Sequence, residues 1–413
     1  MIKVAVLGYG VVGSGVVSLL NKNAKHISKN AGQDIQVKYI LDIREFPNDP
    51  FEKIFVNDFE TIIHDPEVTI VVEAIGGTGI AYDYTQRCLQ AGKHVITSNK
   101  ELVAEHGGEL MRHAQERDVN FLFEASVGGG IPVIRPLVQC MTANIIGEIY
   151  GILNGTTNYI LTNMEQNGTS FSDALLEAQQ KGYAEADPTA DIEGFDTCRK
   201  ICILSSLAFG QHISPNQVPT EGIKNVKTSD MHYASTLGYE IKLLGRARAV
   251  NDKAAVYVAP HLVNKDNLLS IVNYAMNGVV VRGNAVGDVV LCGAGAGKLP
   301  TASAVVADII DAVKHLHTRR WIGWSQDNVN ITIDPNQLES AWYIKTDASK
   351  EKVEHEFGTV LFAENKNKTP TTSVGKEYNE TAFITGVMNG NKVDELLSRG
   401  IKALSRFRVL GDH

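Results

Sequence analysis

The chain has 413 residues, of which 44% are hydrophobic and 21% charged, and its formal net charge is −8. This composition predicts a globular protein of two or three domains with a large core. The negative net charge argues against the basic surface of a nucleic-acid-binding protein. The sequence contains no run of about 18 apolar residues, so we expect no membrane partner. Because the five cysteines form no CxxC pair, we expect reduced thiols and a cytoplasmic location.

The first elements have the pattern of a dinucleotide-binding fold. An apolar run, KVAVLG, leads into glycines with the spacing G-x-G-x-x-G, and residues at helical spacing follow. Such glycines let the backbone approach a pyrophosphate, whose charge faces the helix N-terminus. The residues expected to bind NAD or NADP here are Gly8, Gly10, Val11, Val12 and Gly13.

The second expected strand leaves the choice of cofactor open. VKYIL ends directly before Asp42, and Arg44 follows two residues later. An acidic residue at this place accepts a hydrogen bond from the ribose 2′-hydroxyl of NAD, whereas an arginine holds the 2′-phosphate of NADP. Both cofactors therefore remain candidates.

Strands and helices continue to alternate up to about residue 130. The apolar segments 69–77, 94–100 and 120–125 predict strands, and 81–91 predicts a helix. Near-continuous apolar strands between helices predict a parallel sheet covered on both faces, with ligands beyond the carboxyl ends of the strands. Thr97, Ser98 and Lys100 fall at the end of such a strand and are expected to border the cofactor. Lys100 is either a solvated lysine at a helix start or a group that polarises a carbonyl.

The segment 182–200, GYAEADPTADIEGFDTCRK, surrounds a turn with carboxylates and then supplies a lysine. Its acidic residues are Glu185, Asp187, Asp191, Glu193 and Asp196. Asp196 and Lys200 lie four apart on an expected helix and so share one face. The pair is either an ordinary surface ion pair or, since nearby carboxylates keep the lysine protonated, a proton donor for a carbonyl oxygen.

Five motifs in one order resemble those of homoserine dehydrogenases. They are GYGVVGSGV at Gly8, TSNKELVA at Thr97, EASVGGGIPVIRPL at Glu124, NGTTNYILTNM at Asn154 and the acidic segment at Gly182; AGAGKLPTASAVVADI at Ala294 extends the match to about residue 315. The resemblance implies reversible reduction of L-aspartate 4-semialdehyde to L-homoserine by NADH or NADPH, in the synthesis of threonine and methionine.

The resemblance also implies roles for single residues. Lys200 matches the proposed proton donor, and Lys100 matches a lysine beside the nicotinamide and the substrate. Glu185, Asp191 and Asp196 fall on the acidic substrate site, with Glu185 at the amino end of the substrate.

Two further parts of the match concern a loop and a cation. The glycine loop that includes Gly297 is expected to close over the cofactor, and the helix at about 300–318 to pack back on the first domain. In the family, one carboxylate and neighbouring carbonyls hold a structural sodium ion. The matching positions are Glu124, Val127, Gly129 and Ile131. A glycine-rich turn can aim carbonyl oxygens at a hard cation, or it can be a tight turn without an ion.

We therefore predict an α/β protein in three parts. Residues 1–130 form a Rossmann-type, doubly wound parallel sheet. Residues 131–320 form an α+β catalytic domain that, by resemblance, makes a homodimer or higher homo-oligomer, and 321–340 is a linker. Residues 341–413, with expected strands that include AWYIKT and TTSV, form a ferredoxin-like βαββαβ module similar to the regulatory ACT domains of the family.

The ACT-like module departs from the family pattern. Such domains often bind an amino acid such as threonine, and an Asp-Arg-Pro-Gly turn usually follows their first strand. Here the chain reads TDASKEKVEHEF. Feedback inhibition and a role in dimer contacts alone both remain open.

Two rival functions fit parts of the sequence. A phosphorylating aspartate-semialdehyde dehydrogenase needs a cysteine nucleophile with a base, and no cysteine here lies in such a motif. A catalytically silent NAD(P)-binding regulatory protein would be expected to lack the lysine or its acidic neighbours, which are present.

Overall fold

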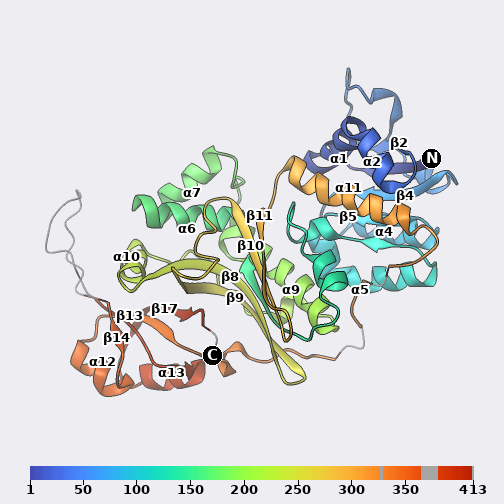
Figure 1. The fold of residues 1–413 in the computed structure, drawn as a ribbon. Helices are drawn as coiled ribbons and strands as arrows, with labels where there is room; N and C mark the ends of the chain where they lie inside the picture. Colours follow the sequence, from blue (N-terminus) through green and yellow to red (C-terminus); the bar gives the residue numbers. More distant parts are fainter. Residues whose placement is uncertain (321, 326–328, 364–379, 412–413) are drawn as a thin grey trace. The chain divides into compact units, whose positions relative to one another are not determined.

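The computed structural model describes residues 1–320, 322–325, 329–363 and 380–411 (Figure 1). The chain divides into two compact units. Unit 1 comprises Met1–Ile149, Arg199–Gln217 and Val279–Ile331, and unit 2 comprises Tyr150–Cys198, Val218–Gly278 and Thr332–His413. The predicted middle domain, 131–320, is thus shared between the two units. Of the predicted linker, residues 321 and 326–328 lie outside the described part.

A six-stranded parallel sheet forms the centre of unit 1, in the order β3-β2-β1-β4-β5-β6. Its strands are β1 (Ile2–Leu7), β2 (Ile35–Leu41), β3 (Phe55–Val56), β4 (Val68–Glu73), β5 (His94–Thr97) and β6 (Phe121–Leu122). The strand order reverses between β1 and β4, and this confirms the predicted doubly wound sheet. Ligands of such sheets bind beyond the carboxyl ends of the strands at this reversal.

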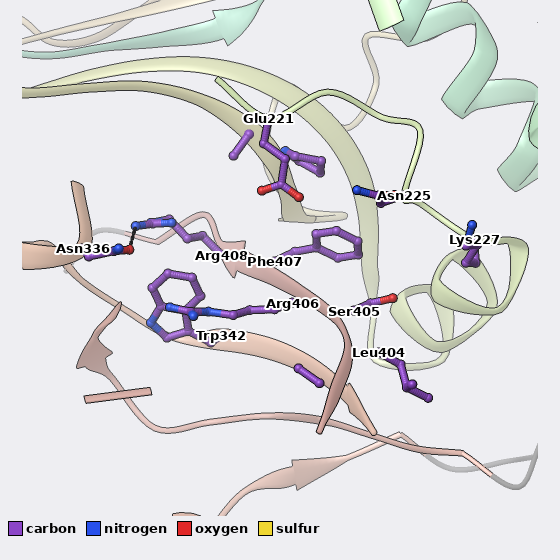
Figure 2. A pocket seen from close by; sticks show the side chains of 13 residues that line it. Glu221, Asn225, Lys227, Asn336, Trp342, Leu404, Ser405, Arg406, Phe407 and Arg408 are labelled. Carbon is purple, nitrogen blue, oxygen red and sulfur yellow. Dashed lines mark hydrogen bonds between the residues drawn. The ribbon is translucent and has the colours of Figure 1, made fainter. Parts of the chain in front are cut away.

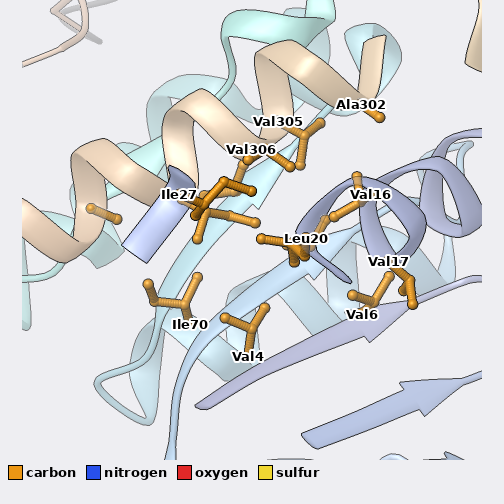
Figure 3. Packing of buried hydrophobic residues seen from close by; sticks show 14 of the residues in the cluster. Val4, Val6, Val16, Val17, Leu20, Ile27, Ile70, Ala302, Val305 and Val306 are labelled. Atoms are coloured by element: carbon orange, nitrogen blue, oxygen red, sulfur yellow. The ribbon is translucent and has the colours of Figure 1, made fainter. Parts of the chain in front are cut away.

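Helices from the first and the last chain segment of unit 1 pack together against this sheet. The helices are α1 (Val11–Lys22), α2 (Ala24–Ala31), α3 (Glu60–Ile63), α4 (Ile80–Gln90), α5 (Lys100–Glu116) and α11 (Lys298–Lys314). In one apolar core, Val16 and Leu20 of α1 lie with Val305 of α11 (Figure 3). Gly15 permits this approach, because a Cβ there would lie 2.8 Å from the carbonyl oxygen of Lys298.

The predicted strand 120–125 is shorter than expected. β6 ends at Leu122, and a 3-10 turn spans Glu124–Ser126. The physical reason is that the backbone N–H of Glu124 donates to the Asp308 carboxylate, at 2.9 Å, instead of joining the ladder. The chain then passes through a π-helical turn, Pro136–Cys140, into β7 (Ile146–Ile152). In the second, mixed sheet β7 is followed in order by β10 (Met276–Gly283) and β11 (Gly287–Ala294).

Unit 2 is built on the long antiparallel pair β8 (Tyr239–Val250) and β9 (Lys253–Asn264). Its helices before the C-terminal module are α6 (Gly155–Asn167), α7 (Phe171–Gln180), α8 (Thr189–Ile192) and α10 (Thr228–Thr236). The helix α9 (Phe195–Phe209) begins in unit 2 and continues into the segment of unit 1 that starts at Arg199. None of the helices in the described residues has the length and apolar character needed to cross a bilayer.

The C-terminal module runs strand, helix, strand, strand, helix, strand, with a further two-residue strand, β16 (Met388–Asn389), before its second helix. It contains β13 (Trp342–Thr346), α12 (Lys350–Phe357), β14 (Leu361–Phe362), β15 (Thr381–Ile384), α13 (Gly390–Leu397) and β17 (Ala403–Val409), and its strands run β17-β13-β15-β14. β14 was not predicted as a strand. The predicted strand TTSV, 371–374, lies outside the described residues. A parallel pairing of β17 with β9, Arg408 opposite His261, joins the module to the sheet of unit 2.

Candidate active site

The glycine turn after β1 is shaped by close backbone approaches. A Cβ at Gly13 would lie 1.9 Å from the carbonyl oxygen of Gly8, and one at Gly8 would lie 2.7 Å from that of Ala74. Gly10, the N-cap of α1, is different, since a Cβ there would meet no heavy atom within 4 Å. The fold itself therefore needs Gly8 and Gly13. The space at Gly10, in front of a helix N-terminus, fits the predicted approach of a dinucleotide pyrophosphate.

The residues on either side of that turn have different exposures. Val11, the first residue of α1, is 66% exposed, whereas Val12 is half-buried and packs against the core beneath the helix. The predicted cofactor contact at Val11 is thus open to a ligand. Val12 takes part in holding the turn.

Asp42 and Arg44, the two residues that could select NAD or NADP, form an ion pair with each other. Nε and Nη2 of Arg44 lie 2.9 and 2.8 Å from the two carboxylate oxygens of Asp42, which also accepts a hydrogen bond from the Tyr9 N–H at 2.7 Å. The Arg44 guanidinium holds the pKa of Asp42 well below its usual range. A cavity of about 410 Å³ adjoins this pair. It offers both an acceptor for a ribose hydroxyl and a cation for a phosphate.

A buried hydrogen-bond network shapes the carboxyl ends of β4 and β5. The Thr97 hydroxyl donates to the fully buried Glu73 carboxylate, which also accepts the backbone N–H groups of Ile75 at 2.8 Å and Gly76 at 3.1 Å. This network fixes the loop that follows β4 beside the end of β5. Glu73 was missed in the sequence, although its place as the last residue of an apolar strand before a glycine turn was a usable signal.

The next residue along, Asn99, decides where α5 begins. Its Oδ1 accepts the Leu102 N–H at 3.1 Å, and its Nδ2 donates to the Gly77 carbonyl at 2.6 Å. Asparagine is a favoured N-cap, so the chain turns into helix here. Lys100 is consequently the first residue of α5. The predicted strand 94–100 was too long, because β5 ends at Thr97.

The two predicted lysines lie on neighbouring helices of unit 1. Nη1 of Arg199, on α9, is 3.3 Å from Oε1 of Glu101, on α5. Glu101 follows Lys100 and Arg199 precedes Lys200, so the ion pair brings together the helix segments that carry both lysines. Lys200 is buried, with 8% of its surface exposed.

In unit 2, one asparagine joins two of the predicted substrate carboxylates. Nδ2 of Asn154 donates to Oδ1 of Asp191 at 2.6 Å and to Oδ2 of Asp196 at 2.9 Å. Asn154 and Asp196 are both buried. Oδ1 of Asn154 accepts the Thr157 N–H at 2.8 Å and so caps α6. The sequence suggested a capped turn here but not the bridge between carboxylates.

Glu185 occupies a different setting from the other two carboxylates. It is exposed, in the turn between α7 and α8, and its backbone carbonyl accepts a hydrogen bond from Nε2 of Gln179 at 3.1 Å. The structure thus brings Asp191 and Asp196 together through Asn154, and Glu185 lies on the exposed turn.

The Glu124 turn, predicted to hold a cation, is dominated by backbone donors. The Glu124 carboxylate accepts the N–H groups of Val133, Ile134 and Arg135 at 2.7, 2.8 and 2.7 Å. A carboxylate offers about four acceptor sites, so three are used. The nearby Asp308 is buried, which raises its pKa to about 7, while Arg135 acts in the opposite direction. A cation at this turn would have to rely mainly on carbonyl oxygens.

The glycine loop before α11 packs directly on the same turn. Gly130 donates its N–H to the Ala294 carbonyl at 3.1 Å, and a Cβ at Gly129 (φ +58°) would lie 2.2 Å from the carbonyl oxygen of Gly295. Gly297, with φ +120°, is the N-cap of α11. Val127 and Ile131 flank the turn and are buried. The predicted cation turn and the predicted cofactor loop are therefore one packed structure.

Comparison with known proteins gives one consistent result. A family model described as homoserine dehydrogenase matches residues 132–310, and one described as homoserine dehydrogenase, NAD binding domain, matches residues 8–124. The homoserine dehydrogenase of Pseudomonas aeruginosa is 44% identical, covering 76% of this chain and 72% of the relative. That of Neisseria gonorrhoeae is 40% identical, covering 85% and 82%.

Solved structures agree with these relatives. The crystal structure of a homoserine dehydrogenase from Thiobacillus denitrificans superimposes with a TM-score of 0.86 at 35% identity, covering 99% of this chain and 98% of that one. A hyperthermophilic archaeal homoserine dehydrogenase in complex with NADPH gives a TM-score of 0.65 at 26% identity, covering 75% and 97%.

Proposed function

Because the chain belongs to the homoserine dehydrogenase family of NAD(P)-dependent oxidoreductases, we propose that it interconverts L-homoserine and L-aspartate 4-semialdehyde. The observation that supports this most is that the Asn154 amide joins the carboxylates of Asp191 and Asp196. Asp196 lies one helical turn before Lys200 on α9. Two fixed carboxylates suit an ammonium group, and a lysine suits a developing alkoxide.

The carboxylates serve recognition in this proposal. Asp191 and Asp196 accept charge-assisted hydrogen bonds from the α-ammonium group of the substrate, and Glu185 takes part at its amino end. Asn154 acts as a positioning residue, because its amide fixes both carboxylates from the rigid start of α6.

Lys200 serves proton transfer. Asp196, four residues earlier on the same helix, favours the ammonium form of the lysine. In the direction of reduction Lys200 donates its proton to the oxygen of the aldehyde, and in the direction of oxidation it accepts the hydroxyl proton. Lys100 assists by polarising the same oxygen. No covalent intermediate with the chain is required.

The nicotinamide cofactor, when bound, supplies or accepts the hydride at C4 of the substrate. Gly8 and Gly13 shape the turn, and Gly10 gives the pyrophosphate access to the N-terminus of α1. Thr97 and Ser98 border the cofactor site at the end of β5. The Asp42–Arg44 pair faces the ribose, and we propose that it decides between NAD and NADP.

Two further features belong to the proposal. Carbonyl oxygens of Val127, Gly129 and Ile131, with the remaining acceptor site of Glu124, suit a monovalent cation such as sodium. Thermal unfolding in sodium chloride against tetramethylammonium chloride tests this, since a bound ion raises Tm. We also propose that the chain forms a homodimer through its middle part, residues 131–320, since symmetric dimers are the commonest soluble assembly. Light scattering of the protein as it elutes from a size-exclusion column measures the oligomeric state.

The reaction is tested with the purified full chain, L-homoserine and either NAD⁺ or NADP⁺. Homoserine-dependent formation of reduced nicotinamide, with aspartate 4-semialdehyde as the product and no need for phosphate, supports the proposal. A need for phosphate during oxidation of the aldehyde would favour the phosphorylating rival. A folded protein that binds cofactor and shows no turnover would favour the regulatory one. Added L-threonine tests whether the C-terminal module inhibits.

A further inference from the structure

A cavity of about 470 Å³ lies in unit 2 against β17 and shares no residue with the candidate active site. Its walls come from the segment 221–227, from Ala259 and Pro260 of β9, and from Trp342 and residues 403–408 of the C-terminal module (Figure 2). The altered turn after β13 is not among the lining residues. This cavity is therefore formed jointly by the module and the β8–β9 part of unit 2.

Two arginines of β17 lie over one indole ring. Arg406 and Arg408 lie two residues apart and so point to the same face of the strand. The guanidinium carbon of each is 4.2 Å from the ring centre of Trp342, and that of Arg408 is also 4.9 Å from the ring centre of Tyr257. Stacking fixes the plane of a guanidinium and leaves its N–H groups at the edge for hydrogen bonds.

The charge of Arg408 lacks a carboxylate partner within the described residues. Only 9% of this residue is exposed, its Nη2 donates to Oδ1 of Asn336 at 2.9 Å, and its Nε has no hydrogen-bond partner there. Arg406 pairs with Asp394, but its Nε also lacks a partner in the described structure. Glu221 and Asp334 act on Arg408 from beyond ion-pair distance, and the neighbouring cations Arg406 and Arg246 repel it. Burying a cation with no carboxylate in contact is costly, so this arrangement favours an anion.

The other polar groups of the cavity define what the anion would carry. Among the described residues, Lys227, Arg406 and Arg408 are its basic lining residues and Glu221 is its acidic one. Glu221 is open to the cavity, and the surrounding protein raises its pKa while Arg408 and Arg406 lower it. A ligand here meets cations along β17 and a single hydrogen-bond acceptor carboxylate on the segment 221–227.

We propose that this cavity binds a small organic oxyanion, a carboxylate or a phosphate ester, with its anionic group on Arg408 and Arg406. A planar carboxylate or a phosphate matches the fork of an arginine. The volume lies in the usual range for small-molecule sites, and Trp342 supplies the apolar wall that such sites have. A hydroxyl or other donor of the same ligand would face Glu221.

Occupation of the cavity would tie the module to the rest of unit 2. Arg408 is also one of the two residues through which β17 pairs with β9, where it lies opposite His261. A ligand held by Arg408 and Lys227 would therefore contact both sides of that junction. The inference does not depend on the proposed reaction, and its test uses binding rather than turnover.

The test is thermal unfolding and titration calorimetry of the full chain with sodium phosphate, sodium succinate or, as reference, sodium chloride at equal ionic strength. Phosphate or succinate is expected to raise Tm above chloride in proportion to the logarithm of its concentration. Whichever anion acts more strongly identifies the ligand class. Arg408→Gln should weaken binding by roughly tenfold or more, the value of a hydrogen bond to a charged group. Arg399→Gln, an exposed arginine of the same module, should bind as the unmodified chain does.

A second variant keeps the test decisive if Arg408→Gln fails to fold. Glu221→Gln removes the one negative charge of the lining and should bind phosphate more tightly. Two results would overturn the proposal: neither anion shifts Tm beyond chloride, or Arg408→Gln and Glu221→Gln bind phosphate like the unmodified chain.

Discussion

Nδ2 of Asn154 lies 2.9 Å from Oδ2 of Asp196 and donates a hydrogen bond to it. The same nitrogen donates to Asp191, and the side-chain oxygen of Asn154 caps α6. Asn154 stands at the rigid start of α6 and from there holds the two carboxylates at a defined separation. The proposed site for a substrate ammonium group depends on this arrangement.

Two substitutions at Asn154 separate the carboxylate bridge from the helix cap. Asn154→Ser keeps a good N-cap but lacks the amide, whereas Asn154→Ala loses both and should destabilise the fold by about 0.5–2 kcal/mol. We expect both variants to raise KM for L-homoserine to a similar extent, and only the alanine variant to lower Tm clearly. If Asn154→Ser kept the original KM, the amide would not position the carboxylates.

The glycine turn provides a matched pair for cofactor binding. Gly13→Ala forces a Cβ against the Gly8 carbonyl and should cost at least about 1–3 kcal/mol of stability. Gly10→Ala meets open space and should cost at most about 1 kcal/mol, as an alanine at an N-cap does. Calorimetric titration of Gly10→Ala with NADPH should nevertheless show binding weakened by roughly tenfold, about 1.4 kcal/mol. Unchanged affinity would place the pyrophosphate elsewhere.

Arg44 is expected to matter more for one cofactor than for the other. Its loss in Arg44→Ala removes a charged hydrogen bond worth about 1.5–3 kcal/mol to a 2′-phosphate, so kcat/KM with NADP⁺ should fall by roughly tenfold to a hundredfold. With NAD⁺ the change should be small, because Asp42 is then free to accept the ribose hydroxyl. Arg112→Ala, an exposed arginine on α5, serves as the control. Equal losses with both cofactors would contradict the assignment.

Glu165 of α6 predicts a specific pH dependence of stability. Burial raises the pKa of Glu165 to about 7. The charge of Glu240 also raises this pKa, whereas the charges of Lys242 and Lys265 lower it. The folded chain therefore holds this proton more tightly than the unfolded chain. The stability contribution is complete below the unfolded pKa and is lost as pH rises through about 7.

The substitution Glu165→Gln should remove that dependence. Its Tm should exceed that of the unmodified chain near pH 8, with a smaller difference near pH 5, since glutamine stays neutral. Glu105→Gln, an exposed glutamate on α5, should follow the unmodified chain at each pH. A constant Tm difference across this range would show that Glu165 does not titrate as described.

Local patterns were sufficient to predict five of the six strands of the first sheet, whereas the two-residue edge strand β3 was not predicted. Apolar strands, the glycine spacing and the helical segments between them are encoded within a few residues of each other, and the doubly wound parallel sheet follows from them. Boundaries were less predictable when a distant residue sets them. β6 stops at Leu122 because Asp308, on α11, takes the Glu124 N–H, and no local pattern contains that contact.

The same distinction applies to the sites. Gly10, Lys100 and Lys200 could be proposed from spacing and resemblance, because each lies in a continuous motif. The bridge from Asn154 to Asp196 joins residues 42 positions apart, and the stacking of Arg408 on Tyr257 and Trp342 joins three separate segments. Such contacts exist only once the chain is folded, so the cavity beside β17 had no signal in the sequence.

The most direct test of the account is the rate at which Lys200→Met reduces L-aspartate 4-semialdehyde with NADPH, measured beside the exposed-lysine control Lys25→Met. Methionine fills the buried site without a proton to donate, so turnover should fall by about 10²–10⁴-fold, the usual value of a general acid. Tm and NADPH affinity should stay close to those of the unmodified chain. Near-normal turnover by folded Lys200→Met would contradict the assignment of Lys200 as the proton donor.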